Sequence, residues 1–259
     1  MYNLLIASGA AVLGYVVGAL VVNPYAGFLP ALLAFVIAFI LLARRTGKQV
    51  EALFGGAMAL LQAGKIEEAR AALEAAMPLG KWQILVTEQI HSQLGALDYL
   101  QAVGHSVQKQ QTQAKARYAS GRAHLEKAWS RDWRAYATLA AIHHREGRPD
   151  DAVKALEKAS GAGKGEALYW GLYTYVLNEA KRRDEALQVI GRGLAENKDN
   201  KALASIQEAL ANKRRPDMKV LGDSWFQMFP EDIPREKLME MQGIKNQPRP
   251  QKTFPQPRR

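Results

Sequence analysis

The chain of 259 residues contains no cysteine. Without thiols it cannot build a disulfide framework, a thiolate zinc site or an iron–sulfur cluster, and it cannot use a cysteine nucleophile. Asp, Glu, Lys and Arg are also absent from residues 1–43, although they make up 23% of the whole chain. A long uncharged segment followed by a charged remainder indicates that the two parts meet different solvents, one apolar and one aqueous.

Two uncharged runs in this segment are long enough to be membrane helices. Residues 4–22 are rich in Val, Leu, Ala and Gly, and a helix of that length, at about 1.5 Å per residue, spans a hydrocarbon core of roughly 30 Å. Residues 23–27 read NPYAG and predict a turn. Residues 28–43 form the second run, with Pro30 in the first helical turn, where proline is tolerated.

A cleaved signal peptide is an alternative interpretation of the first run. No basic residue precedes the run, it is too long, and a second run follows it, so this alternative is disfavoured. A re-entrant hairpin stays open, because the second run is short. We predict a two-helix transmembrane anchor over residues 1–45.

Basic residues predict how the anchor is oriented. Arg44, Arg45 and Lys48 follow the second run, whereas the turn at 23–27 carries no charge. By the positive-inside rule, the N-terminus and the large domain then lie in the cytoplasm of a bacterial cell. The predicted location is the bacterial inner (plasma) membrane. The first predicted partner is the lipid bilayer, and the basic flanks can contact anionic lipid.

Small residues recur along one face of the first run, at Ala7, Ala11, Gly14 and Gly18. Such a stripe lets two helices approach closely in lipid. The expected neighbour is the second helix, which carries small residues at Ala31, Ala34 and Ala38. A second copy of the chain is the alternative neighbour.

From residue 50 the pattern changes to amphipathic helices in pairs. The sequence GKIEEA at 64–69 recurs as GRPDDA at 147–152 and as RRDEA at 182–186. Ala152 and Ala186 are 34 residues apart, and a large apolar residue follows each alanine by four positions. The residues that define the repeat are Gly64, Ala69, Leu73, Ala76, Gly147, Ala152, Leu156, Ala159, Ala186 and Ile190.

This pattern resembles the tetratricopeptide repeat family, whose period is about 34 residues. The resemblance implies paired helices stacked into an open α-solenoid, in which a glycine ends the first helix of each pair. Residues 95–100 have the shape of a further copy that begins at Gly95, with Leu100 in place of alanine, and Lys181 replaces the glycine of the last copy. The order of two membrane helices, a basic flank and repeats is similar to the layout of bacterial HemY-type membrane proteins.

The predicted fold is therefore all-α. A transmembrane hairpin (1–45) precedes a tetratricopeptide-like solenoid (50–213), which ends in a capping helix at 201–213. An aromatic segment and an irregular, proline-rich basic tail follow (214–259). We expect residues 220–230 to pack back on the repeats or to bind a partner, and residues 234–241 to form a short helix. Residues 242–259 contain no acid and are expected to be extended or disordered.

No motif for catalysis, for a cofactor or for a metal stands out. Residues 160–165 read SGAGKG but lack the other residues of a phosphate-binding loop. His143 and His144 are adjacent, so on a helix they point about 100° apart and do not chelate one ion together. We expect a binding protein that has no enzymatic activity.

The resemblance implies that the first helix of each pair lines a concave surface that binds peptides. The residues that would face a partner there are Gln89, Gln93, Arg134, His144, Arg145, Tyr175 and Asn178. Polar and cationic side chains suit an extended or acidic peptide, although these positions can also be ordinary solvated helix faces. The predicted function is a membrane-anchored scaffold or adaptor that docks protein partners.

RNA or ribosome contact is the alternative function. The net charge of +10 is compatible with anionic lipid, nucleic acid or an acidic protein. The cations that would contact RNA are those of the basic tail together with Lys109, Lys115, Arg117, Arg122 and Arg131. Phe254 is the lone aromatic residue of the tail, so base stacking has little support there, and nucleic acid is the less favoured partner.

Overall fold

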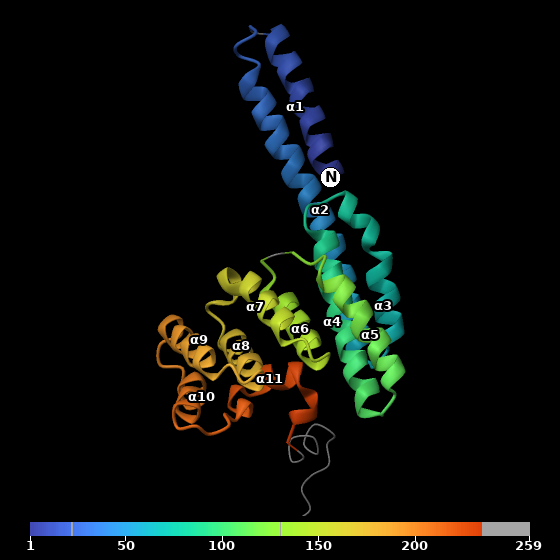
Figure 1. Ribbon diagram of the computed structural model, residues 1–259. Helices are drawn as coiled ribbons and strands as arrows, with labels where there is room; N and C mark the ends of the chain where they lie inside the picture. Colours follow the sequence, from blue (N-terminus) through green and yellow to red (C-terminus); the bar gives the residue numbers. More distant parts are fainter. Residues whose placement is uncertain (22, 130, 235–259) are drawn as a thin grey trace, which may run out of the picture.

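The computed structural model describes residues 1–21, 23–129 and 131–234, and every secondary-structure element assigned in them is a helix. Figure 1 shows a helical hairpin that projects from a body of packed helices. The hairpin consists of α1 (Tyr2–Val21) and the first part of α2 (Phe28–Gln62). In the turn between them, the side-chain oxygen of Asn23 accepts a hydrogen bond of 2.8 Å from the amide of Ala26.

The small-residue stripe of α1 packs inside the hairpin. A Cβ atom added at Gly14 would lie 2.8 Å from the carbonyl oxygen of Pro30, and one added at Gly18 would lie 2.8 Å from the Cα atom of Gly27. Ala7 is fully buried. Glycine therefore permits the close contact of the two helix backbones, as it does in membrane helix pairs.

The outer surface of the hairpin is apolar and exposed. Leu13 is 69% exposed, Leu20 82% and Leu29 66%. A core helix of a water-soluble protein would bury such side chains against its neighbours. Both helices are long and apolar enough to cross a membrane.

The second helix does not end where its apolar run ends. We expected a separate helix to begin near residue 50, but α2 continues through Arg44, Arg45 and Lys48 to Gln62 without a break. No proline lies in this stretch, and each of its glycines, at positions 47, 55 and 56, costs only about 1 kcal/mol relative to alanine. Hairpin and body therefore share one continuous helix.

Four helix pairs succeed one another in the described part of the body (Figure 1). They are α2 with α3 (Ile66–Ala75), α4 (Val86–Val107) with α5 (Gln111–Leu125), α6 (Trp133–Arg145) with α7 (Pro149–Gly163), and α8 (Ala167–Glu179) with α9 (Arg183–Glu196). The first helices of successive pairs contact one another, α4 with α6 and α6 with α8.

Shorter elements complete the chain. The 3-10 helix η1 (Met77–Lys81) joins α3 to α4, and α10 (Lys201–Ala211) packs against α8 and α9, ending two residues before the predicted limit at residue 213. Then follow η2 (Met218–Leu221), α11 (Asp223–Met228) and η3 (Pro230–Asp232). The short helix predicted at 234–241 and the basic tail at 242–259 lie outside the described residues, apart from residue 234.

The first helices of the four pairs end in the same way. Gly64, Lys109, Gly147 and Lys181 all have φ between +61° and +75°. In each case the next residue donates a backbone hydrogen bond to the carbonyl five residues back, for example from Arg148 to His143 at 2.9 Å. This is the Schellman cap, in which glycine is preferred because it has no Cβ atom.

The helix end predicted at Gly95 is wrong. Gly95 lies in the middle of α4, which continues to Val107. A Cβ atom there would collide with Leu125 and lie 3.1 Å from the carbonyl oxygen of Gly121, so this glycine allows α4 and α5 to approach closely. The true end of the helix, at Lys109, carries no glycine and gives no signal in the sequence.

Small residues of the repeat pattern lie in the core. Ala69, Ala152 and Ala186 are each fully buried, as are Leu156 and Ile190. Leu73, Ala76 and Ala159 are also buried. The core has two clusters, a smaller one between α2, α3 and α4 around Ile90 and Leu94, and a larger one that extends from α4 to α11.

We predict that Gly147→Ala destabilises the protein by about 1 kcal/mol, because a Cβ atom is disfavoured at positive φ. Space is available for a methyl group at this position, so the loss is one of backbone conformation. Lys181→Gly is the matched change at the equivalent position and should stabilise the protein by a similar amount. Urea titration of the full chain in detergent measures both. If both substitutions stabilised the protein, or both destabilised it, the prediction would be wrong.

Candidate partner-binding groove

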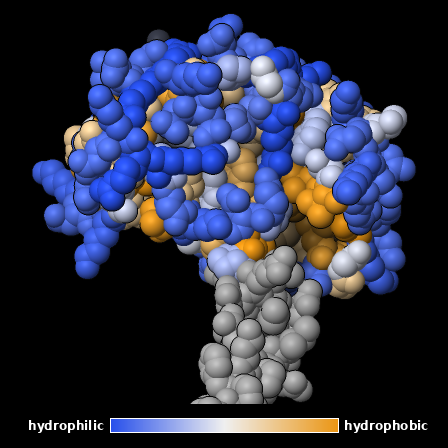
Figure 2. Space-filling model, turned by 60° about the horizontal axis from the view of Figure 1, so that its bottom comes forward, coloured by the Kyte–Doolittle hydropathy of each residue, from blue (hydrophilic) through white to orange (hydrophobic). Residues whose placement is uncertain are grey.

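A groove runs along the first helices of the pairs. One pocket of about 460 Å³ lies between α2, α4, α6 and α11, and a second of about 390 Å³ lies between α2, α3 and α4. Met58 and Gln93 line both pockets, so the two adjoin each other. In Figure 2, which views the side of the body away from the hairpin, apolar atoms are exposed in a hollow among hydrophilic residues.

The open part of the groove combines apolar and polar groups. Met58 is 52% exposed and Leu100 is 48% exposed. Beside them lie Gln93 and the exposed cation Arg134. The side-chain hydroxyl of Ser92 in α4 donates to Asp132, which also accepts hydrogen bonds from the first amides of α6, so the two walls of the groove are tied together.

The other end of the groove is filled by the chain itself. Residues 216–233, here termed the C-terminal segment, pack on α6 and α8. Trp225 and Phe229 are buried, and their rings stack with centroids 4.2 Å apart. Tyr175 of α8 contacts both rings edge-on, at 5.1 and 5.5 Å. The indole nitrogen of Trp225 donates to Asp232 at 2.8 Å. The aromatic residues therefore pack back on the helices.

Arg145 of α6 is central to this contact. Its guanidinium lies 5.1 Å from the ring centroid of Phe229, donates to the Tyr99 hydroxyl at 3.1 Å and pairs with Glu231. The Tyr99 hydroxyl in turn donates to the carbonyl of Met228. Burial raises the pKa of Tyr99 above its ordinary value. A cation stacked on an aromatic ring and paired with a carboxylate holds the segment in place.

The seven residues that we expected to face a partner divide into two groups. Gln89, Gln93 and Arg134 are exposed and line the open pockets. His144, Arg145 and Tyr175 are half-buried at the filled end, where the rings of His144 and Tyr175 lie 5.0 Å apart, and Asn178 is half-buried in the last turn of α8. Pattern reasoning missed several groove residues, Met58, Tyr99, Leu100, Asp132 and Met228, because only the stacking of helices brings them together.

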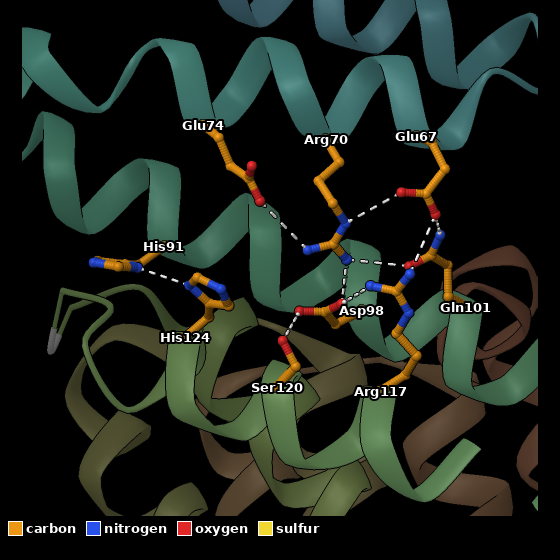
Figure 3. Close-up of polar contacts among 9 residues, drawn as sticks. All are labelled: Glu67, Arg70, Glu74, His91, Asp98, Gln101, Arg117, Ser120 and His124. Atoms are coloured by element: carbon orange, nitrogen blue, oxygen red, sulfur yellow. Dashed lines mark hydrogen bonds and ion pairs between the residues drawn. The ribbon is translucent and has the colours of Figure 1, made fainter. Parts of the chain in front are cut away.

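A buried carboxylate lies on the side of α4 that faces α3 and α5 (Figure 3). Asp98 is fully buried. It accepts hydrogen bonds from Ser120 at 2.7 Å and from Arg117 at 3.3 Å, both on α5, and it pairs with Arg70 of α3. A buried charge is tolerated only when it is paired and hydrogen-bonded, and this one has three partners.

Two more side chains extend this network to the surface. Glu67 of α3 accepts from Gln101 of α4 at 2.8 Å and from Arg117 at 3.2 Å, and Gln101 accepts from Arg70 at 3.1 Å. The network therefore joins three helices between the smaller and the larger apolar cluster. We found no sequence signal for it, because its members lie far apart along the chain.

We predict that Asp98→Asn lowers the free energy of unfolding by about 3 kcal/mol, because two arginines lose the charge that they surround. Glu68→Gln on the exposed face of α3 is the control and should have little effect, since its pair with Lys65 is open to solvent. Urea titration of the wild type and of both variants measures the free energy of unfolding of each. Wild-type stability in Asp98→Asn would mean that the network contributes no net stability.

Two histidines meet beside this network (Figure 3). The Nδ1 atoms of His91 in α4 and His124 in α5 are 2.9 Å apart, so one ring donates and the other must be neutral to accept. Burial lowers the pKa of His91, and the neighbouring His124 and Lys127 lower it further. Burial also lowers the pKa of His124, an effect opposed by Asp98.

Stability should therefore fall in mild acid. The pKa values of His91 and His124 are lower in the folded state than the ordinary value near 6.5 that they regain on unfolding, so below that pH the unfolded chain binds more protons. The free energy of unfolding should decrease from about pH 7.5 to about pH 5.5. The double variant His91→Gln, His124→Gln should lose part of this dependence. An unchanged profile in the double variant would contradict the prediction.

Models of known protein families and curated proteins give no match to this chain. Within the described residues, no group of three or more potential ligand side chains is arranged to hold a metal ion. The groove and the hairpin are thus the features on which a function can be based.

Proposed function

We propose that this chain is a membrane-anchored adaptor that docks a protein partner in the open part of its groove. The observation that carries the proposal is the adjoining pair of pockets along α2, α4 and α6, which places the exposed apolar side chains of Met58 and Leu100 beside Gln93 and Arg134. Apolar contacts supply affinity in such grooves, and a few polar groups fix the orientation of the ligand.

The hairpin supports the anchoring part of the proposal. Its exposed leucine, valine and phenylalanine side chains would be unfavourable in water and favourable in lipid. Arg44, Arg45 and Lys48 are exposed directly after the apolar run, which is the arrangement of a cytoplasmic membrane flank. The proposed location is the bacterial inner membrane, with the groove on the cytoplasmic side.

Several details support a tetratricopeptide-type architecture for the helix pairs. The first helices end in identical caps at Gly147 and Lys181, which are 34 residues apart. In the second helices, Ala152 and Ala186 are buried at the position where the family has a small residue. A resemblance of this kind bears on architecture, and the choice of ligand depends on the residues of the groove itself.

The filled end of the groove indicates what kind of partner the open end accepts. There, aromatic residues and Met228 lie on the helices while Glu231 pairs with Arg145. In the open end Arg134 offers an exposed cation, and the amides of Gln89 and Gln93 can bond to a peptide backbone. We therefore propose a partner segment that combines apolar side chains with a carboxylate.

Site-directed crosslinking in intact membranes tests the proposal. A photoreactive residue at Gln93 of the full-length chain should give a discrete protein adduct, whereas one at the exposed Gln188 on α9, a second helix, should not. Leu100→Glu and Arg134→Glu should each reduce the Gln93 adduct severalfold, since a carboxylate in the groove repels an acidic apolar ligand. The same adduct from both positions, or adducts that neither substitution weakens, would count against docking in the groove.

The RNA alternative gains less support. Arg117 bonds to the buried Asp98, and Arg122 donates to Glu146 at 2.8 Å, so both cations are partly neutralised. Lys109, Lys115 and Arg131 are exposed. The basic tail, which the alternative also needs, lies outside the described residues.

A further inference from the structure

The loop between α3 and α4 lies at the junction of hairpin and body. This junction loop, residues 77–85, includes η1 and reaches the start of α1, as Figure 1 shows beside the N-terminus. The carbonyl oxygen of Trp82 accepts from the amide of Asn3 at 3.4 Å. The rings of Trp82 and Tyr2 meet edge-on with centroids 5.2 Å apart.

A buried polar contact joins α1 to α2 beside the junction loop. The side-chain amide of Asn3 donates to the hydroxyl of Thr46 at 3.0 Å, and both residues are buried. The start of α1, the middle of α2 and the junction loop are therefore held together. The exposed apolar band of the hairpin begins next to this contact, with Leu5 at 66% exposure.

The junction loop continues the apolar band onto the body. Ile84 is 51% exposed and Trp82 is 40% exposed, although each is large and apolar. Lys81 is exposed in the same loop, and Arg44 and Arg45 are exposed on α2 close to Thr46. Tryptophan and tyrosine side chains beside lysine and arginine are typical of the boundary between lipid tails and headgroups.

We propose that the junction loop is a third membrane contact, in which Trp82 and Ile84 enter the headgroup layer and Lys81, Arg44 and Arg45 bind anionic lipid headgroups. This inference rests on the proposed membrane anchor. The continuity of the loop with the lipid-exposed band favours lipid over a protein as its occupant. The insertion depth expected of such an element is about 5–10 Å, which is shallower than that of a spanning helix.

The absence of cysteine makes a direct test possible. Single cysteines replace Ile84, Leu13 and Val107 in the full-length chain, and each is labelled with an environment-sensitive fluorophore. Leu13 is 69% exposed on α1, and Val107 is 66% exposed at the far end of α4, about 33 Å along the helix from the junction loop. The labelled proteins are reconstituted in vesicles of phosphatidylcholine and phosphatidylglycerol, with or without lipids that carry a quencher at the level of the headgroup.

The label at Ile84 should emit at shorter wavelength than the label at Val107 and lose most of its fluorescence to the headgroup quencher. Lys81→Glu should reduce that quenching severalfold, and so should the omission of phosphatidylglycerol. The matched control is Lys109→Glu, at the far end of α4, which should leave the quenching of the Ile84 label unchanged.

The position of the Leu13 label separates the two ways in which the proposal can fail. If that label lies in lipid while the Ile84 label emits and quenches like the Val107 label, the junction loop stands in water and the inference is overturned. If the Leu13 label is also in water, the anchor itself is absent. Each replaced residue is exposed, so the labels leave the packing of the core intact.

Discussion

One uninterrupted helix determines the arrangement of this protein. α2 begins in the hairpin, where its side chains are apolar and exposed, and ends in the body, where Ala57 is buried in the smaller apolar cluster. A helix keeps all its internal hydrogen bonds in either solvent, so it can cross from lipid to water without a break. The junction loop, the first core cluster and one wall of the groove are all built on this helix.

Two further kinds of contact hold the helices of the body together. Between the two apolar clusters, the buried Asp98 of α4 is surrounded by side chains of α3 and α5, and its charge demands these partners. At the far end of the groove, aromatic rings and the Arg145–Glu231 pair hold the C-terminal segment against α6 and α8.

The structural features that could be predicted from the sequence are those that depend on composition and on local spacing. The missing charges indicated the hairpin, and glycine at 64 and 147 marked two helix ends. Sequence reasoning failed at Lys109, where the same cap forms without glycine. It also placed Arg145 at an open surface, because the partner of its charge, Glu231, lies 86 residues away in sequence. The network around Asp98 joins partners up to 50 residues apart and was missed for the same reason.

The continuity of α2 also fixes the distance between the hairpin and the groove. Thr46 lies level with the start of the hairpin, and Met58 follows it by twelve residues on the same helix, a rise of about 18 Å. No flexible linker intervenes, so if the hairpin lies in a membrane as proposed, the groove stays at this distance from the lipid surface. Under the proposed function, a segment that emerges directly from a neighbouring membrane protein would be within reach of the groove, whereas a segment on a large soluble assembly would first have to be brought against the lipid surface.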